Sequence, residues 1–162
     1  MALEIERKYL VAGPFPEDPS AKTLVQGYIA REDGRTVRVR FDGTSYKLTI
    51  KGKSEGIARH EFEWTLEEAE GQALLHGLCT IKIEKVRHKV PHAGFIWEVD
   101  VFSGDNAGLI VAEVELPSAE ASFEIPSWAA REVSDDARFF NAALLDTPFV
   151  TWGVAYEDLL KG

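Results

Sequence analysis

The segment LEIERKYLV at residues 3–11 alternates in chemical character from one position to the next. Successive side chains of an extended strand point to opposite faces, so Glu4, Glu6 and Lys8 share one face. Ile5 lies among the apolar residues of the other face. The segment therefore predicts a β-strand with one charged face and one apolar face.

The same two-residue period recurs along most of the chain. Seven further segments show it, at 22–31, 35–42, 45–51, 58–65, 80–90, 93–102 and 109–116. Short connections that contain Gly separate several of them, such as DGR at 33–35 and PHAG at 91–94, and tight turns of this kind join antiparallel neighbours. Eight short strands in 162 residues predict a mainly antiparallel α+β fold whose sheet closes into an eight-stranded β-barrel, that is, a tunnel.

Four intervals depart from the strand pattern. The first, TLEEAEGQALLHGL at 65–78, predicts a helix with Thr65 as its N-cap. After the last strand, shorter helical pieces are expected at 127–133, 135–145 and 153–160. We expect the helices to pack outside the barrel and at one mouth. Because no repeat or flexible linker interrupts the pattern, residues 1–162 are expected to form a single domain.

The composition limits the classes of partner. A formal net charge of −9 argues against nucleic acid, because clustered Lys and Arg bind phosphate backbones, but it allows a local cationic site for a small phosphorylated ligand. No stretch reaches the roughly 18 apolar residues of a membrane span, and no secretory signal is expected. Cys79 is the sole cysteine, which favours a reducing compartment and a cytoplasmic location. A homodimer is left open.

Like charges recur in pairs on the polar face of the predicted strands. The motifs RVR, EFE, EVD and EVE each place two like charges at positions i and i+2 of one strand. The cations on this face are Lys8, Arg38, Arg40, Lys47, Lys51, Arg59, Lys85 and Arg87. The acids are Glu4, Glu6, Glu61, Glu63, Glu98, Asp100, Glu113 and Glu115. Such pairs repel each other, and a bound group of opposite charge would relieve that cost.

Two interpretations fit this pattern. In the first, the charged face is the solvated outside of an ordinary sheet, and the apolar face is its core. In the second, the charged face lines the tunnel, where carboxylates would bind Mg²⁺ or Mn²⁺ and the cations would bind phosphate oxygens. The repeated like-charge pairs favour the second. The apolar face would then lie outside beneath the helices, together with the aromatic residues Phe62, Trp64, Trp97 and Phe102.

Ordered motifs along the chain resemble the CYTH superfamily, also called the triphosphate tunnel metalloenzymes. The first, EIERKYLV at 4–11, is similar to the ExExK motif of that family. The others follow in order as RVR at 38–40, KLTIKG at 47–52, ARHEFEW at 58–64, WEVDVFSG at 97–104 and EVSDDARFFNAAL at 132–144. The resemblance is strongest to small bacterial tripolyphosphatase-like members. It implies an eight-stranded antiparallel tunnel, a divalent-metal requirement and a substrate that contains a triphosphate.

The resemblance also implies roles for individual residues. The metal ligands would be Glu4, Glu6, Glu61, Glu63, Glu113 and Glu115, with Glu98 and Asp100 helping to place metal or water. The phosphates would be bound by Lys8, Arg38, Arg40, Lys51, Lys85 and Arg87, joined by Lys47, Arg59 and, from the helical layer, Arg138. The residues expected to carry catalysis are Glu4, Glu6, Lys8, Glu61 and Glu63.

The function expected from these residues is metal-dependent hydrolysis of the terminal phosphoryl group of a triphosphate. Inorganic tripolyphosphate is the expected substrate, with nucleoside triphosphates as further candidates. Three alternatives share the same charged groups: a class IV adenylate cyclase, a thiamine triphosphatase and a non-catalytic polyphosphate-binding module. A cyclase would also need a pocket for adenine and ribose, whereas a binding module would need mainly the cations.

Overall fold

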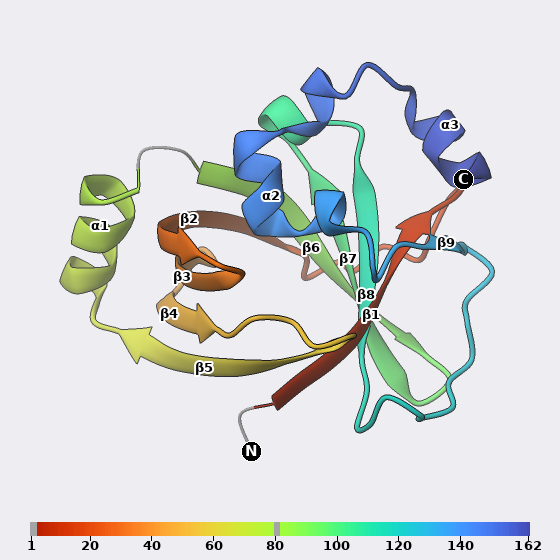
Figure 1. Ribbon diagram of the computed structural model, residues 1–162, viewed down its shortest axis with the longest axis horizontal. Coiled ribbons are helices and arrows are strands. Elements are labelled where there is room, and N and C mark those ends of the chain that lie inside the picture. Colours follow the sequence, from red (N-terminus) through yellow and green to blue (C-terminus); the bar gives the residue numbers. More distant parts are fainter. Residues whose placement is uncertain (1–2, 80–81) are drawn as a thin grey trace.

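Eight antiparallel strands form a closed ring in the computed structural model, which describes residues 3–79 and 82–162 (Figure 1). The strands of the ring are β1 (Leu3–Val11), β2 (Lys22–Glu32), β3 (Arg35–Phe41), β4 (Tyr46–Lys51), β5 (Ala58–Leu66), β6 (Lys82–His92), β7 (Phe95–Phe102) and β8 (Ile110–Glu115), and a further strand outside the ring is β9 (Ala129–Glu132). The ring follows the order β5-β4-β3-β2-β6-β7-β8-β1, and pairing of β1 with β5 closes it. The predicted closed antiparallel barrel is confirmed, although the start of the strand expected at 80–90 lies outside the described residues.

Strand β1 closes the ring because both of its edges are paired. One edge pairs with β8. On the other edge, residues 3–5 pair with β5, and the part of β1 beyond that seam pairs with β9. The helix expected at 127–133 is therefore wrong, because residues 129–132 form a strand. The backbone groups at this edge of β1 need partners, and β9 supplies them.

Two hairpins turn at the positions that the sequence marks. Between β2 and β3, Asp33 and Gly34 have φ values of 48° and 78°. Between β6 and β7, Ala93 and Gly94 have φ values of 48° and 85°. Two consecutive residues with positive φ are typical of the tight turns whose twist matches that of the flanking strands. These turns fix the register that brings the charged side chains to one face.

Helix α1 (Glu68–Gly77) lies outside the ring, against β2, β3 and β4 (Figure 1). Its Leu75 packs with Val39, Tyr46 and Cys79 in a buried cluster. The predicted N-cap at Thr65 is wrong, because β5 continues to Leu66 and the helix begins after Glu67.

The contact between α1 and the sheet depends on Gly71. A methyl group added there would overlap the ring of Tyr46. We expect Gly71→Ala to lower the free energy of unfolding by about 1–3 kcal/mol, because overpacking outweighs the better helix propensity of Ala. Gly77→Ala is the matched control, since no atom lies within 4 Å of a Cβ at that position. Urea denaturation would show the difference, and equal stability of the two variants would contradict this close packing.

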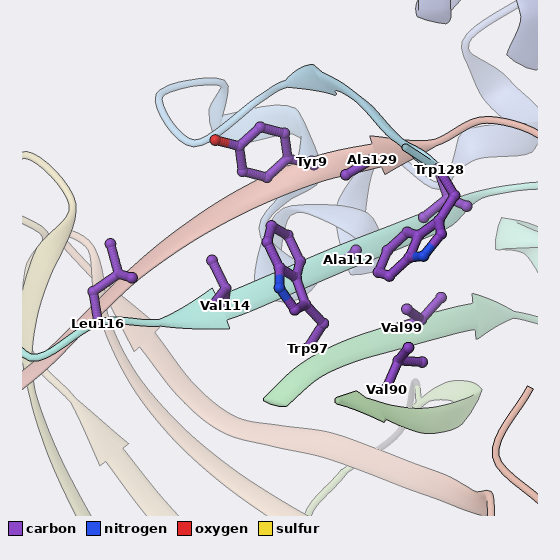
Figure 2. Packing of buried hydrophobic residues seen from close by; sticks show 10 residues of the cluster. Tyr9, Val90, Trp97, Val99, Ala112, Val114, Leu116, Trp128 and Ala129 are labelled. Atoms are coloured by element: carbon purple, nitrogen blue, oxygen red, sulfur yellow. The ribbon is translucent and has the colours of Figure 1, made fainter. Parts of the chain in front are cut away.

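An aromatic core covers the outside of β1, β6, β7 and β8 (Figure 2). Trp97 is fully buried at its centre, with ring centroids 5.5 Å from Tyr9 and 5.7 Å from Trp128. Phe123, in the segment between β8 and β9, packs against Tyr9 and Trp97. The placement of Trp97 on the outer face is confirmed.

The interior of the ring is apolar at one end. Leu10 pairs with Val111 on the face that carries Lys8, and Phe102 pairs with Lys85. These side chains pack with Ile83 and with residues of the C-terminal segment. That segment contains the short helices η2 (Ala137–Phe139), α2 (Asn141–Asp146), η3 (Phe149–Thr151) and α3 (Tyr156–Lys161). The C-terminal helices therefore cover one mouth of the ring, as expected. The prediction that Phe102 lies on the outer face is wrong, because Phe102 is two residues from Asp100 on β7 and points to the same, inner face.

In the described part of the chain, the outer face of β5 at Phe62 and Trp64 is not covered by a helix. Phe62 is 47% exposed and Trp64 is 50% exposed, so their expected burial beneath helices is wrong. The reason is that α1 contacts β2, β3 and β4 and stops short of this face. Within the described ranges, none of the helices has the length and apolar character required to cross a membrane.

Candidate functional site

The ring encloses a charged cavity of about 590 Å³. Every strand of the ring contributes to its lining. The lining residues that the sequence predicted are Glu4, Glu6, Lys8, Arg38, Arg40, Lys51, Arg59, Glu61, Glu63, Lys85, Arg87, Glu98, Glu113 and Glu115. Because these side chains converge inside the ring, the interpretation of the charged face as a solvated outer surface is wrong.

Three predicted site residues do not line this cavity. Lys47 contacts Glu63, a lining residue, with its Nζ 3.7 Å from Glu63 Oε1. Asp100 is fully buried and forms an ion pair with Lys85. Arg138 is half exposed, binds Asp136 at 2.7 Å and lies over the ring of Trp152. The structure thus gives no support to substrate contact by Arg138, because its guanidinium is held in the C-terminal segment.

Several lining residues were not predicted. Tyr28 and Thr36 come from β2 and β3, and Phe140 and Asn141 come from the C-terminal segment. Strand parity could have identified the first two, because Thr36 shares the face of Arg38. No periodic pattern in the sequence predicts Phe140 and Asn141 as lining residues. The segment at 135–145 reaches the cavity through an irregular turn between two short helices, not through the expected continuous helix.

Carboxylates gather where β1 meets β8. Glu6 pairs directly with Glu115, and Glu113 pairs directly with Glu98 on β7. Burial, together with the charges of Glu113 and Glu4, raises the pKa of Glu6 well above its usual value. Burial and the neighbouring acids also raise the pKa of Glu115. At Glu6 the charges of Lys8 and Lys51 act in the opposite direction, but they only partly offset burial and the neighbouring acids.

Other acids of the cavity have cationic partners. Lys51 Nζ lies 3.0 Å from Glu4 Oε1 and 3.1 Å from Glu61 Oε2. Lys8 Nζ lies 3.4 Å from Glu113 Oε1 and donates a hydrogen bond to the carbonyl oxygen of Phe139. Burial acts to raise the pKa of Glu113, but the nearby cations, Lys8 above all, outweigh it and hold that pKa below its usual value. The cavity wall therefore interleaves both signs of charge.

A buried ion-pair network holds Lys85 and Arg87. Asp100 accepts hydrogen bonds from Arg87 at 2.7 and 2.8 Å, and its Oδ2 lies 2.8 Å from Lys85 Nζ. Burial lowers the pKa of Lys85 to about 8, although Asp100 acts in the opposite direction. Asn141 Oδ1 accepts a further hydrogen bond from Lys85 at 2.8 Å. Both oxygens of Asp100 therefore contact cations in this structure, and these contacts hold the side chains of Lys85 and Arg87 in place.

The donor set suits a hard divalent cation by its chemistry. Glu4, Glu6, Glu113 and Glu115 offer carboxylate oxygens, which are the ligands that Mg²⁺ and Mn²⁺ prefer. The raised pKa values of Glu4, Glu6 and Glu115 indicate acids that a cation would stabilise in their ionised form. Within residues 3–79 and 82–162, no group of three or more His, Cys, Asp or Glu side chains is already assembled as a metal site.

The arrangement can bind an anion that carries several charges together with a divalent cation. Arg and Lys side chains donate hydrogen bonds to phosphate oxygens, and Arg can do so with two parallel bonds. Carboxylates on the opposing strands can hold the cation that accompanies such an anion. One charged cavity thus offers both kinds of group that a metal–polyphosphate complex would need.

Comparisons with known proteins agree with this arrangement. A family model described as the CYTH domain matches residues 2–140. A relative from Acetivibrio thermocellus named inorganic triphosphatase is 42% identical over 151 residues, covering 92% of this chain and 97% of its own length. A second relative with that name, from Nitrosomonas europaea, is 37% identical over 147 residues, covering 87% and 95%. A crystal structure of an inorganic triphosphatase is similar, with a TM-score of 0.64 and 36% identity over 90% of this chain and 95% of the other.

Proposed function

Because this chain belongs to the CYTH domain family, we propose that it is an inorganic triphosphatase, a hydrolase that removes the terminal phosphoryl group of inorganic tripolyphosphate. The two relatives that bear this name align with nearly the whole chain. The observation that carries the proposal is the cavity inside the ring, where cations and carboxylates face each other across a few ångströms.

The cavity is lined by enough cations to offset the charge of the substrate. Tripolyphosphate carries about four to five negative charges near neutral pH, because each of its phosphates has lost one proton and the two terminal groups titrate near pH 6 or above. The side chains proposed to bind it are Lys8, Arg38, Arg40, Lys51, Arg59, Lys85 and Arg87, which line the cavity, together with Lys47, which contacts Glu63 of the lining. Phosphoryl transfer requires little covalent chemistry from a protein, so in-line placement and charge neutralisation by these groups would supply most of the catalysis.

Mg²⁺ or Mn²⁺ is the proposed cofactor, and Glu4, Glu6, Glu113 and Glu115 are its proposed ligands. When bound, the cation would neutralise charge on the phosphate oxygens. The C-terminal segment limits the access of bulk water at its end of the cavity, because it fills the ring with apolar side chains there. We place the protein in the cytoplasm, since its single cysteine is typical of a reducing compartment.

A panel of phosphate-release assays tests the proposal. Tripolyphosphate, ATP and thiamine triphosphate are each incubated with the protein and Mg²⁺ or Mn²⁺, and products are separated by ion-exchange chromatography. We expect phosphate and pyrophosphate from tripolyphosphate at a rate that exceeds that with either other substrate. Cyclic AMP from ATP would instead identify a cyclase, and binding of tripolyphosphate without turnover in any metal would identify a binding module.

A further inference from the structure

We infer that Glu63 is an internal counter-anion rather than a metal ligand, and that a phosphate group of the substrate takes its place among three cations. The inference rests on the proposed function, because it assigns a role within the same cavity. The three cations are Arg38 and Arg40 of β3 and Lys47 of β4, called here the cation cluster. Glu63 was expected among the metal ligands, so the inference separates it from that set.

The cation cluster converges on one carboxylate. Arg38 Nη2 and Arg40 Nη2 each lie 3.9 Å from Glu63 Oε2, and Lys47 Nζ lies 3.7 Å from Oε1. Thr49 Oγ1 donates a hydrogen bond of 2.8 Å to Glu63 and accepts one of 3.1 Å from Arg38 Nη2. Register sets this row, because Arg38 pairs with Thr49 and Thr49 pairs with Glu63 across three strands.

The cluster needs a negative charge to hold it together. Arg40 pairs directly with Lys47 on the neighbouring strand, and like charges placed opposite each other destabilise a sheet. Burial, followed by the charges of Arg38 and Arg87, lowers the pKa of Arg40, whereas Glu63 opposes that shift. Glu63 thus compensates a repulsion that the strand register imposes.

Glu63 accepts no direct hydrogen bond from Arg38, Arg40 or Lys47. The three nitrogen–oxygen distances of 3.7–3.9 Å exceed the length of a hydrogen bond. Arg38 Nε is buried and has no hydrogen-bond partner among the described residues. A phosphate group has more oxygens than a carboxylate and can accept from several such donors at once. The cluster is therefore better matched to a phosphate group than to Glu63.

The pKa of Glu63 is shifted in the opposite direction from the pKa values of Glu6 and Glu115, the acids that pair between β1 and β8. Burial acts to raise the pKa of Glu63, but the Thr49 hydrogen bond and the charges of Arg40 and Lys47 lower it overall. Three cations around one carboxylate would repel a divalent metal ion. The Glu63 side chain also remains 30% exposed, against 10% for Arg38, so it can turn away without burying an unpaired charge.

The test uses Glu63→Gln, which keeps the size of the side chain and an oxygen that can accept from Thr49. Isothermal titration calorimetry with tripolyphosphate in metal-free buffer containing EDTA should show binding that is about 3- to 10-fold tighter than in the wild type, because an opposing charge is removed. Mn²⁺ binding, titrated separately without EDTA, should stay within about twofold of the wild type. Glu115→Gln is the matched control, and its Mn²⁺ binding should weaken about 10-fold or more.

The outcomes distinguish a counter-anion role of Glu63 from a metal-ligand role. Weaker Mn²⁺ binding in Glu63→Gln, as in the control, would make Glu63 a metal ligand and overturn the inference. Unchanged or weaker tripolyphosphate binding would also overturn it, while leaving the proposed function intact. A wild-type protein that neither binds nor hydrolyses tripolyphosphate would instead remove the proposed function. If Glu63→Gln fails to fold, Glu63→Ala removes the same charge, and the same changes are expected in both titrations.

Discussion

Replacing Glu6 with Gln is expected to lower the kcat/KM of metal-dependent phosphate release by about 10²- to 10³-fold while leaving the protein at least as stable. Glu6 is one of four proposed metal ligands, and it pairs directly with another acid, Glu115. Burial and two further carboxylates raise its pKa well above the usual value, so its charge is costly in the folded protein. Loss of function without loss of stability is the result that distinguishes a ligand from a structural residue.

The sign of the stability change follows from the raised pKa. A carboxyl group whose folded-state pKa exceeds its unfolded value lowers stability as pH rises through the interval between the two values. At neutral pH without metal, ionisation of the buried Glu6 carboxyl therefore lowers the free energy of unfolding of the wild type. The variant avoids this loss, because Gln has no charge. Thermal unfolding in EDTA should show the variant melting at the same or a higher temperature than the wild type. Added Mn²⁺ should raise the melting temperature of the wild type more than that of the variant.

Glu124→Gln serves as a control, because Glu124 is exposed and lies outside the cavity. This control should retain the wild-type rate and the wild-type response to Mn²⁺. Full activity in Glu6→Gln would remove Glu6 from the proposed metal set. A variant that loses both activity and stability would show that Glu6 acts through the fold.

The strands could be predicted because two local signals agree. Side-chain alternation places Lys8 and Arg38 on the inner face, and residues with positive φ, such as Gly34, mark the turns between strands. Closure of the ring required only that eight strands be accommodated without a free edge. The ordered like-charge pairs then identified the lining of the cavity, because like charges on one strand need opposite charge nearby, from a facing strand or from a ligand.

The remaining features depend on contacts between residues distant in the sequence. Residues 129–132 become strand β9 because β1 has an edge to pair there, which no local pattern reveals. Phe102 has the inward parity of Asp100, but that this inward position is apolar depends on the C-terminal segment that packs against it. Asp100 has the same parity as Glu98, yet Lys85 and Arg87 surround it, so sequence alone could not separate a positioning residue from a ligand.

Replacing Arg38 with Ala is expected to lower kcat/KM for tripolyphosphate by about 10²- to 10³-fold. Arg38 lies at the centre of β3, it is 8% exposed, and its Nε has no partner among the residues that the structure describes. Its planar guanidinium can donate two parallel hydrogen bonds to one phosphate group, an arrangement that Lys cannot reproduce. Arg38→Lys should therefore recover only part of the lost activity, since it restores the charge but not the geometry.

Arg35→Ala is the matched control for Arg38→Ala, because Arg35 lies on the same strand with 63% of its side chain exposed and pairs with Glu32. Steady-state kinetics with tripolyphosphate should show no more than a twofold change in this control. Equal rates for Arg38→Ala and the wild type would place the substrate elsewhere, since a buried guanidinium with a free donor would then have no role in binding it. Full recovery by Arg38→Lys would reduce that role to charge alone, because shape-specific donation to phosphate requires the guanidinium itself.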